Sequence, residues 1–249
     1  MKSNNLFSGA GYLFQGLKLV LRPGLRRYVV APIIINTVLF SAVIYFGANW
    51  IFEYSQSLLP AWLDFLAFIL VPVFLLLSAV VMFFSFTLVA NLIASPFNGL
   101  LAEAVEYRLA GRELPALSLT AVVREAGRTV VSELKKLGYI LIRLIPLLLL
   151  FFIPVIGPLV WAGFSAWMLA ISYVDYPLAN HGLAFPEQRA LLGGRRWLGL
   201  GFGVAVMAAM AVPVINFIVM PCAVAGATAL CLDQFAASMQ SEQVPATRD

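Results

Sequence analysis

The feature that most constrains this chain is a run without any charged residue, from Tyr28 to Phe52. A helix of roughly 25 residues rises about 37 Å, which is enough to cross the hydrocarbon core of a bilayer with some tilt. A second apolar run extends from Phe65 to Ala102. Because both runs are continuous and do not alternate with a period of two, they predict membrane-spanning helices rather than the strands of a barrel.

The composition places the whole chain in the same class. Hydrophobic residues make up 62% of the sequence and charged residues only 11%, whereas a soluble domain carries about 25% charged residues. The sequence therefore predicts an all-α integral membrane protein. The net charge of +4 is too small to indicate a nucleic-acid partner. Cys222 and Cys231 lie in an apolar stretch and are expected to be buried thiols.

Two later apolar runs, Leu144–Val174 and Trp197–Leu232, are each interrupted by a proline-containing turn. The turns are expected at Pro154–Pro158 and Pro213–Asn216. The first arm, Leu144–Ile153, has about ten residues and reaches roughly 15 Å, about half way across a bilayer. We therefore predict two re-entrant, half-penetrating helical hairpins, while four short spans are the alternative that length alone leaves open.

All segments are assigned to a single membrane domain, residues 1–249. Apolar residues recur with helical periodicity between Leu6 and Leu21, which predicts an amphipathic helix in the plane of the membrane surface. Pro, Asn and Gly in Ser95–Gly99 predict a non-helical break before a new helix from Leu100. The predicted segments are an interfacial helix at 6–21, two long transmembrane helices at 28–52 and 72–93, cytoplasmic amphipathic helices at 103–143, helical hairpins at 144–174 and 197–232, and a disordered tail at 238–249.

Basic residues indicate which segments share a side of the membrane. The N-terminal segment, residues 103–143 and the loop Asp175–Arg196 are basic, whereas the linker Glu53–Asp64 contains no lysine or arginine. The positive-inside rule therefore places both termini and both large loops in the cytoplasm. The bias is modest, so a population inserted the other way round stays open.

The basic stretch Arg22–Arg27 precedes the first apolar run and is a candidate anion site. Arginine presents a planar fork of donors that suits oxyanions. A helix start adds backbone N–H groups and the positive end of a dipole. The alternative is an ordinary basic anchor at the membrane edge.

Polar residues at membrane depth are candidates for a transport pathway. Irregular backbone at that depth is tolerated where it is buried or lines a cavity. Acidic residues after such a break can titrate or gate the path by pairing with a basic residue. The alternatives are adhesion between helices and a solvated, salt-bridged helix. The pathway candidates are Asn36, Asn91, Ser95, Asn98, Glu103, Glu106, Arg108 and Asn216.

Enzymatic and nucleotide-driven functions are not supported. Ser165, Asp175 and His181 lack the nucleophile-elbow context of a hydrolase, and one histidine with a lone aspartate does not make a zinc site. No phosphate-binding glycine loop is present in the sequence. We expect no catalytic residue, metal or cofactor, and we expect Asp175–Pro177 with Asn180 and His181 to cap a helix end and pin a loop.

Several stretches, in order from about Gly16 to Asp233, carry a resemblance to a known family. They are Pro23–Arg27, Ser95–Glu103, Phe164–Ala170, Asp175–Pro177 with Asn180–His181, and Met220–Pro221 with Gly226–Ala229. Together they are similar to the bacterial CysZ proteins, inner-membrane sulfate permeases that feed cysteine biosynthesis. The combination is specific, although each stretch alone is not.

The resemblance implies uptake of sulfate across the bacterial inner membrane by a multi-pass protein without an ATP-binding subunit. It implies two long transmembrane helices, two half-penetrating hairpins and homo-oligomers built from dimers, with a hexamer as one candidate. It assigns sulfate binding to Gly24, Leu25, Arg26 and Arg27. Whether the path is a channel or a proton-responsive carrier, and which anions it selects, stays open. The alternative function is a non-transporting membrane scaffold or assembly protein whose basic turn binds lipid head groups.

Overall fold

The computed structural model describes residues 4–55, 73, 76, 77, 80, 94–115, 118–151 and 153–241. The regular structure of these residues is helical throughout. The chain divides into two compact units, one formed by Met1–Val29 with Pro96–Asp249 and the other by Val30–Ser95. Most of the predicted helix at 72–93 lies outside the described residues, together with Asn91 and residues 242–249 of the tail expected at 238–249. The prediction of disorder is wrong for residues 238–241, because they are helical.

The apolar run that opened the sequence forms α2, Arg26–Ser55. Its window Arg26–Phe46 has a mean hydropathy of 2.2, and only 6% of that window is buried. A helix that exposes apolar side chains along its length is stable in lipid and not in water. Pro32 lies inside the helix, where membrane helices tolerate proline because neighbouring groups satisfy the freed carbonyl.

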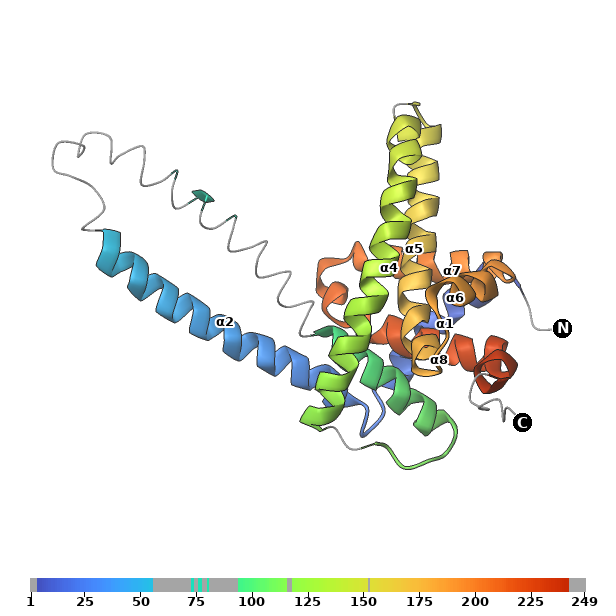
Figure 1. Cartoon of the computed structure of the whole chain (residues 1–249), viewed down its shortest axis with the longest axis horizontal. Coiled ribbons are helices and arrows are strands. Elements are labelled where there is room, and N and C mark those ends of the chain that lie inside the picture. The colour runs from blue at the N-terminus through green and yellow to red at the C-terminus, as the bar shows by residue number, and fades with distance from the viewer. Residues whose placement is uncertain are drawn as a thin grey trace, which may run out of the picture. The chain divides into compact units, whose positions relative to one another are not determined.

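The core of the larger unit forms where α1, Leu6–Val20, packs against α7, Arg196–Met210, and α8, Pro213–Ser241 (Figure 1). The buried face of α1 includes Tyr12 and Leu13. The helix expected at the membrane surface is therefore part of the core, and its exposed apolar face is formed by Leu6, Phe7, Phe14 and Leu17, with Leu21 directly after the helix.

A long hairpin is formed by α4, Leu119–Phe151, and α5, Ile156–Asn180, which run antiparallel (Figure 1). Residues 144–151, expected to form a separate arm with residues 152 and 153, are the last part of α4. The side chains at the tip are apolar and exposed, Leu149 by 70% and Val155 by 73%. Among the described residues, three helical stretches are long and apolar enough to cross a membrane, namely Arg26–Phe46, Ile156–Asn180 and Ile218–Met239.

The predicted non-helical break at Ser95–Gly99 is wrong, because residues 94–109 are helical. Proline removes only one backbone donor, and the tertiary environment compensates for it. Residues 96–102 are buried, and the side-chain amide of Asn180 donates to the carbonyl of Gly99 at 3.0 Å. Burial and side-chain hydrogen bonds therefore outweigh the local preference for a turn.

The turn expected at Pro213–Asn216 is misplaced for a related reason. The chain turns at Ala211 and Val212, and Pro213 is the first residue of α8. Proline suits this position because its N–H would have no helical partner and its φ angle already matches a helix. A short helix, α6 at Phe185–Gly193, links the α4–α5 hairpin to α7. Cys222 and Cys231 are buried free thiols, as expected.

Candidate functional site

The turn before α2 is shaped by Gly24 and Leu25. Gly24 has a φ angle of +90°, a left-handed conformation that glycine adopts without steric cost. A Cβ atom at this position would lie 2.5 Å from Cδ1 of Leu114, so the turn also packs closely against the segment that precedes α4. Leu25 is completely buried in the hydrophobic core, so its side chain fixes the turn in place. The first residue of α2 is Arg26, so both adjacent arginines belong to the first helical turn.

The two arginine side chains are exposed but held in place. Arg26 Nε donates to the carbonyl of Leu21 at 2.9 Å. Arg27 Nη2 donates to the carbonyl of Pro115 at 2.6 Å, and its guanidinium carbon lies 5.0 Å from the centroid of the Tyr28 ring. The Tyr28 hydroxyl donates to the same Pro115 carbonyl at 2.8 Å. Because a guanidinium has five N–H donors, these contacts orient each side chain and leave most of its donors for a ligand.

Backbone donors add to this turn. The N–H groups of Leu25 and Tyr28 bond to the carbonyls of Arg22 and Leu25. Those of Gly24, Arg26 and Arg27 make no hydrogen bond to any described residue. A helix start with open N–H groups carries a partial positive charge. The turn therefore combines two guanidinium groups, three backbone donors and a helix dipole, which is the chemistry that binds an oxyanion.

A second polar region lies where α5 meets the helix of residues 94–109. His181 Nε2 is 2.9 Å from Glu106 Oε2, and the Asn98 amide donates to the Tyr176 hydroxyl at 3.4 Å. Together with the Asn180–Gly99 hydrogen bond, these contacts join the C-terminal end of α5 to that helix. The expected role of this motif in pinning the chain was correct, but its partner is another helix rather than a loop.

A buried ion pair completes this region. Lys136 Nζ lies 3.0 Å from Asp175 Oδ2, and both side chains are about 5% exposed or less. It ties α4 to α5. Sequence reasoning missed Lys136, because a lysine in a charged amphipathic segment looks solvated. The residue in the sequence that could have pointed to Lys136 was Asp175, since an aspartate within an apolar helix requires a cationic partner.

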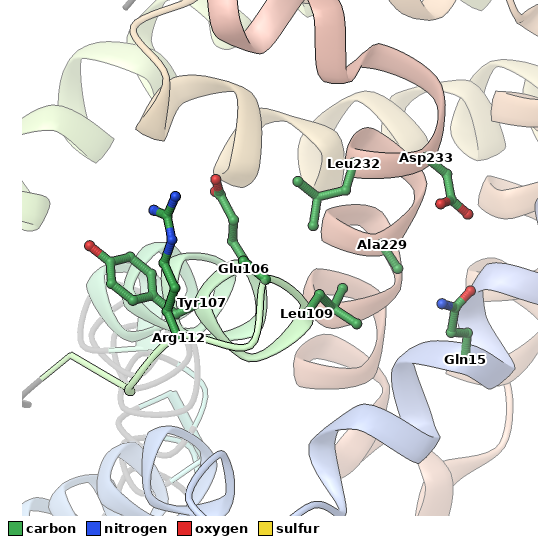
Figure 2. A pocket seen from close by; sticks show the side chains of 9 residues that line it. Gln15, Glu106, Tyr107, Leu109, Arg112, Ala229, Leu232 and Asp233 are labelled. Carbon is green, nitrogen blue, oxygen red and sulfur yellow. The ribbon is translucent and has the colours of Figure 1, made fainter.

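Glu106 also lines a cavity of about 470 Å³. Figure 2 shows Glu106 and Arg112 on one side of this cavity and Gln15 and Asp233 on the other. The hydroxyl of Tyr12 donates to Asp233 Oδ2 at 3.0 Å. Burial raises the pKa of Tyr12, with a further contribution from the Asp233 carboxylate, so this tyrosine stays a donor at neutral pH. The cavity thus carries charges of both signs and is lined mainly by polar groups.

The remaining pathway candidates occupy different environments. Glu103 is half-buried and Arg108 is exposed, both on the helix of residues 94–109. Asn36 and Ser95 belong to the smaller unit, and Oδ1 of Asn36 is shielded from solvent without a hydrogen bond to the described residues. Asn216 lies on α8, and nothing is described of its side chain. Asn98 and Glu106 are therefore the candidates that the structure brings to one place, at the end of α5.

These features define a class: an all-helical membrane protein with a cationic turn at the start of an exposed apolar helix. Comparison with known proteins gives the family. Residues 12–221 match the family described as "Sulfate transporter CysZ/Etoposide-induced protein 2.4".

Curated relatives agree with this match. The chain is 47% identical over 232 residues to the sulfate transporter CysZ of Pseudomonas fluorescens strain Pf0-1, covering 90% of this chain and 92% of the relative. It is 42% identical over 229 residues to that of Pseudomonas aeruginosa strain PAO1, covering 89% and 93%. For Pectobacterium atrosepticum the identity is 39% over 239 residues, covering 92% and 86%. The chain belongs to the sulfate transporter CysZ family, which is a family of transporters and not of enzymes.

Proposed function

We propose that this protein carries sulfate into the bacterial cytoplasm for sulfur assimilation and cysteine biosynthesis. Its relatives are named sulfate transporters. The observation that carries the proposal is the turn Gly24–Arg27, where two guanidinium groups and three open backbone N–H groups meet at the start of α2. We place sulfate binding at Gly24, Leu25, Arg26 and Arg27, with Leu25 acting as the buried anchor of the turn.

The chemistry of sulfate fits such a turn. A small dianion is strongly hydrated, so a site must replace much of its water with hydrogen-bond donors and positive charge. Arg26 and Arg27 supply the charge, and the helix start supplies donors that need no reorganisation. The turn is exposed, which limits the strength of binding. A transport site benefits from this limit, because an ion that binds too tightly does not leave.

The path itself is proposed to follow the polar groups named from the sequence. Asn98 and Glu106 line its part beside α5, and Asn36, Asn91, Ser95, Glu103, Arg108 and Asn216 are its further candidates. We propose a multi-pass protein of the inner membrane with both termini in the cytoplasm, in which the α4–α5 and α7–α8 hairpins enter the membrane only half way. Because half-penetrating hairpins do not seal a full path, we propose that a dimer-based homo-oligomer completes it. No ATP-binding subunit is required in this scheme.

Liposomes test the proposal. Purified protein reconstituted without nucleotide should take up radiolabelled sulfate faster than empty liposomes. The double variant Arg26→Ala/Arg27→Ala should reduce uptake at least tenfold, because it removes two charge-assisted contacts worth roughly 1.5–3 kcal/mol each. Arg22→Ala is the matched control, since it removes a charge from the same turn and leaves both proposed ligands.

Each result has a defined meaning. Uptake no faster than that of empty liposomes would favour the scaffold alternative, in which the arginines bind only lipid head groups. Normal uptake by the double variant would place the site elsewhere in the protein. An equal loss in Arg22→Ala would show that general surface charge, and not this turn, attracts the anion.

A further inference from the structure

Two arginines share one aromatic ring at the junction of α4 and α6. The guanidinium carbon of Arg143 lies 3.7 Å from the centroid of the Tyr139 ring, and that of Arg189 lies 5.3 Å from it. The rings of Tyr139 and Phe185 meet edge to face, with the ring centroids 5.4 Å apart and the planes at 72°. We refer to Tyr139, Arg143, Phe185 and Arg189 as the Tyr139 cluster. It gathers two positive charges from two different helices around one ring.

Neither guanidinium of the Tyr139 cluster forms an ion pair with a carboxylate in the part of the chain that the structure describes. Glu187, the acid of α6, accepts a hydrogen bond from the N–H of Ala184 at 2.6 Å and so caps its own helix. Asp175 of α5 is already paired with Lys136. Like charges held close together repel, so the cluster is complementary to an anion that offers several oxygen acceptors.

The cluster also marks the edge of an apolar surface. Arg143 is the last charged residue of α4, and the chain carries no further charge until Asp175. Beyond Arg143 the helix exposes apolar side chains such as Ile145 and Leu149 up to the tip of the hairpin. Figure 1 shows α6, which carries Arg189, beside the hairpin and away from its tip. Arginine at such a boundary lies at the level of the lipid head groups, with the apolar surface below it facing acyl chains.

We propose that the Tyr139 cluster binds the phosphate of an anionic phospholipid, with the acyl chains lying along the exposed apolar face of α4. Two guanidinium groups present forked donors that match a phosphate, and the ring holds both in place. This site is separate in sequence from the turn Gly24–Arg27, and the proposal does not depend on sulfate transport. The apolar surface next to it favours a lipid over a free oxyanion.

Native mass spectrometry of the intact protein in mild detergent tests this proposal. Phosphatidylglycerol is added, with phosphatidylcholine in parallel, and the bound lipid is counted. The variant Arg143→Gln/Arg189→Gln should bind phosphatidylglycerol about thirtyfold more weakly, since each arginine near a membrane surface contributes roughly fivefold in affinity. Arg22→Gln/Arg112→Gln loses the same charge from other parts of the chain, at two exposed positions, and should retain the lipid.

A charge-preserving variant separates the role of charge from that of the forked donors. Arg143→Lys/Arg189→Lys keeps both charges but loses the forked donors and the stacking, so it should bind the lipid more tightly than the glutamine variant and more weakly than the natural protein, with all proteins compared as monodisperse fractions. Unchanged lipid binding in the glutamine variant, or an equal loss in the control pair, would overturn the proposal. Displacement of the lipid by millimolar inorganic phosphate or sulfate would do the same, because it would identify a site for a free oxyanion.

Discussion

At the scale of single residues, the stability of the protein depends on both partners of the buried Lys136–Asp175 ion pair. Removing one partner of a buried pair leaves an uncompensated charge and typically costs about 3–5 kcal/mol, whereas replacing both with apolar residues is often neutral. Lys136→Met should therefore lower the thermal unfolding temperature of the purified protein markedly. Lys136→Met/Asp175→Leu should recover most of the loss. Equal instability of the single and double variants would mean that lysine acts through packing and not through charge.

Gly24 provides a second residue-scale prediction. Gly24→Ala places a side chain at a φ of +90° and against Leu114, at a cost of about 1–3 kcal/mol. The turn should shift, and sulfate binding measured by calorimetry should weaken. Gly111→Ala is the matched control, because Gly111 has a φ of +69° with no atom within 4 Å of the added Cβ. Gly111→Ala should lose some stability and keep its affinity for sulfate. Weakened sulfate binding in both variants would mean that the affinity does not depend on the conformation of the Gly24 turn.

The sequence points to several of the polar residues described above, but not to the partners that they contact. Arg26, Arg27, Glu106 and His181 were all singled out from the sequence, since arginine next to a turn and polar groups within apolar runs are visible there. Their contacts were not visible. The Glu106–His181 and Lys136–Asp175 pairs each join segments that are distant in the chain, and no local pattern encodes which helices meet.

At the scale of elements, α1 depends on close helix packing. A Cβ atom at Gly16 would collide with the carbonyl oxygen of Cys222 and lie 2.6 Å from the backbone nitrogen of Gly226. Small residues at such a crossing let two backbones approach, as in membrane helix pairs. Gly16→Ala should therefore destabilise the protein by roughly 1–3 kcal/mol, since backbone atoms cannot move aside as easily as the end of a flexible side chain.

Gly11 on the same helix is the control for this prediction. A Cβ atom there meets nothing within 4 Å, so Gly11→Ala should stabilise the protein by up to about 1 kcal/mol through helix propensity. Thermal unfolding in one detergent compares the two variants. Equal stability of both would mean that α1 and α8 separate easily and that their close approach contributes little.

The elements themselves were largely predictable, whereas their ends and faces were not. The apolar periodicity of residues 6–21 predicts a helix, but α1 is apolar on two sides, so the pattern alone does not tell which side meets α7 and α8. Both prolines were expected in turns, but Pro96 lies within a helix and Pro213 begins one. Proline restricts the backbone locally, but burial against neighbouring helices decides whether the helix continues.

At the scale of the whole molecule, the depth of the α4–α5 hairpin in the membrane tests the proposal that a second protomer completes the path. The lengths of the two helices do not decide between a half-penetrating and a spanning hairpin, because α4 has 33 residues and α5 has 25. What distinguishes the two arrangements is the environment of the tip. In a half-penetrating hairpin Val155 lies in hydrocarbon, and in a spanning hairpin it reaches the water on the far side.

Cysteine labelling separates these arrangements. Val155→Cys should resist a membrane-impermeant maleimide added to either side of sealed vesicles, since the thiol does not meet water. Glu113→Cys, at an exposed position, should react from the cytoplasmic side only and reports that the reagent works. The native thiols Cys222 and Cys231 are buried and contribute little background. Rapid labelling of Val155→Cys from the periplasmic side would establish a spanning hairpin. A neighbouring protomer would then not be needed to complete the path.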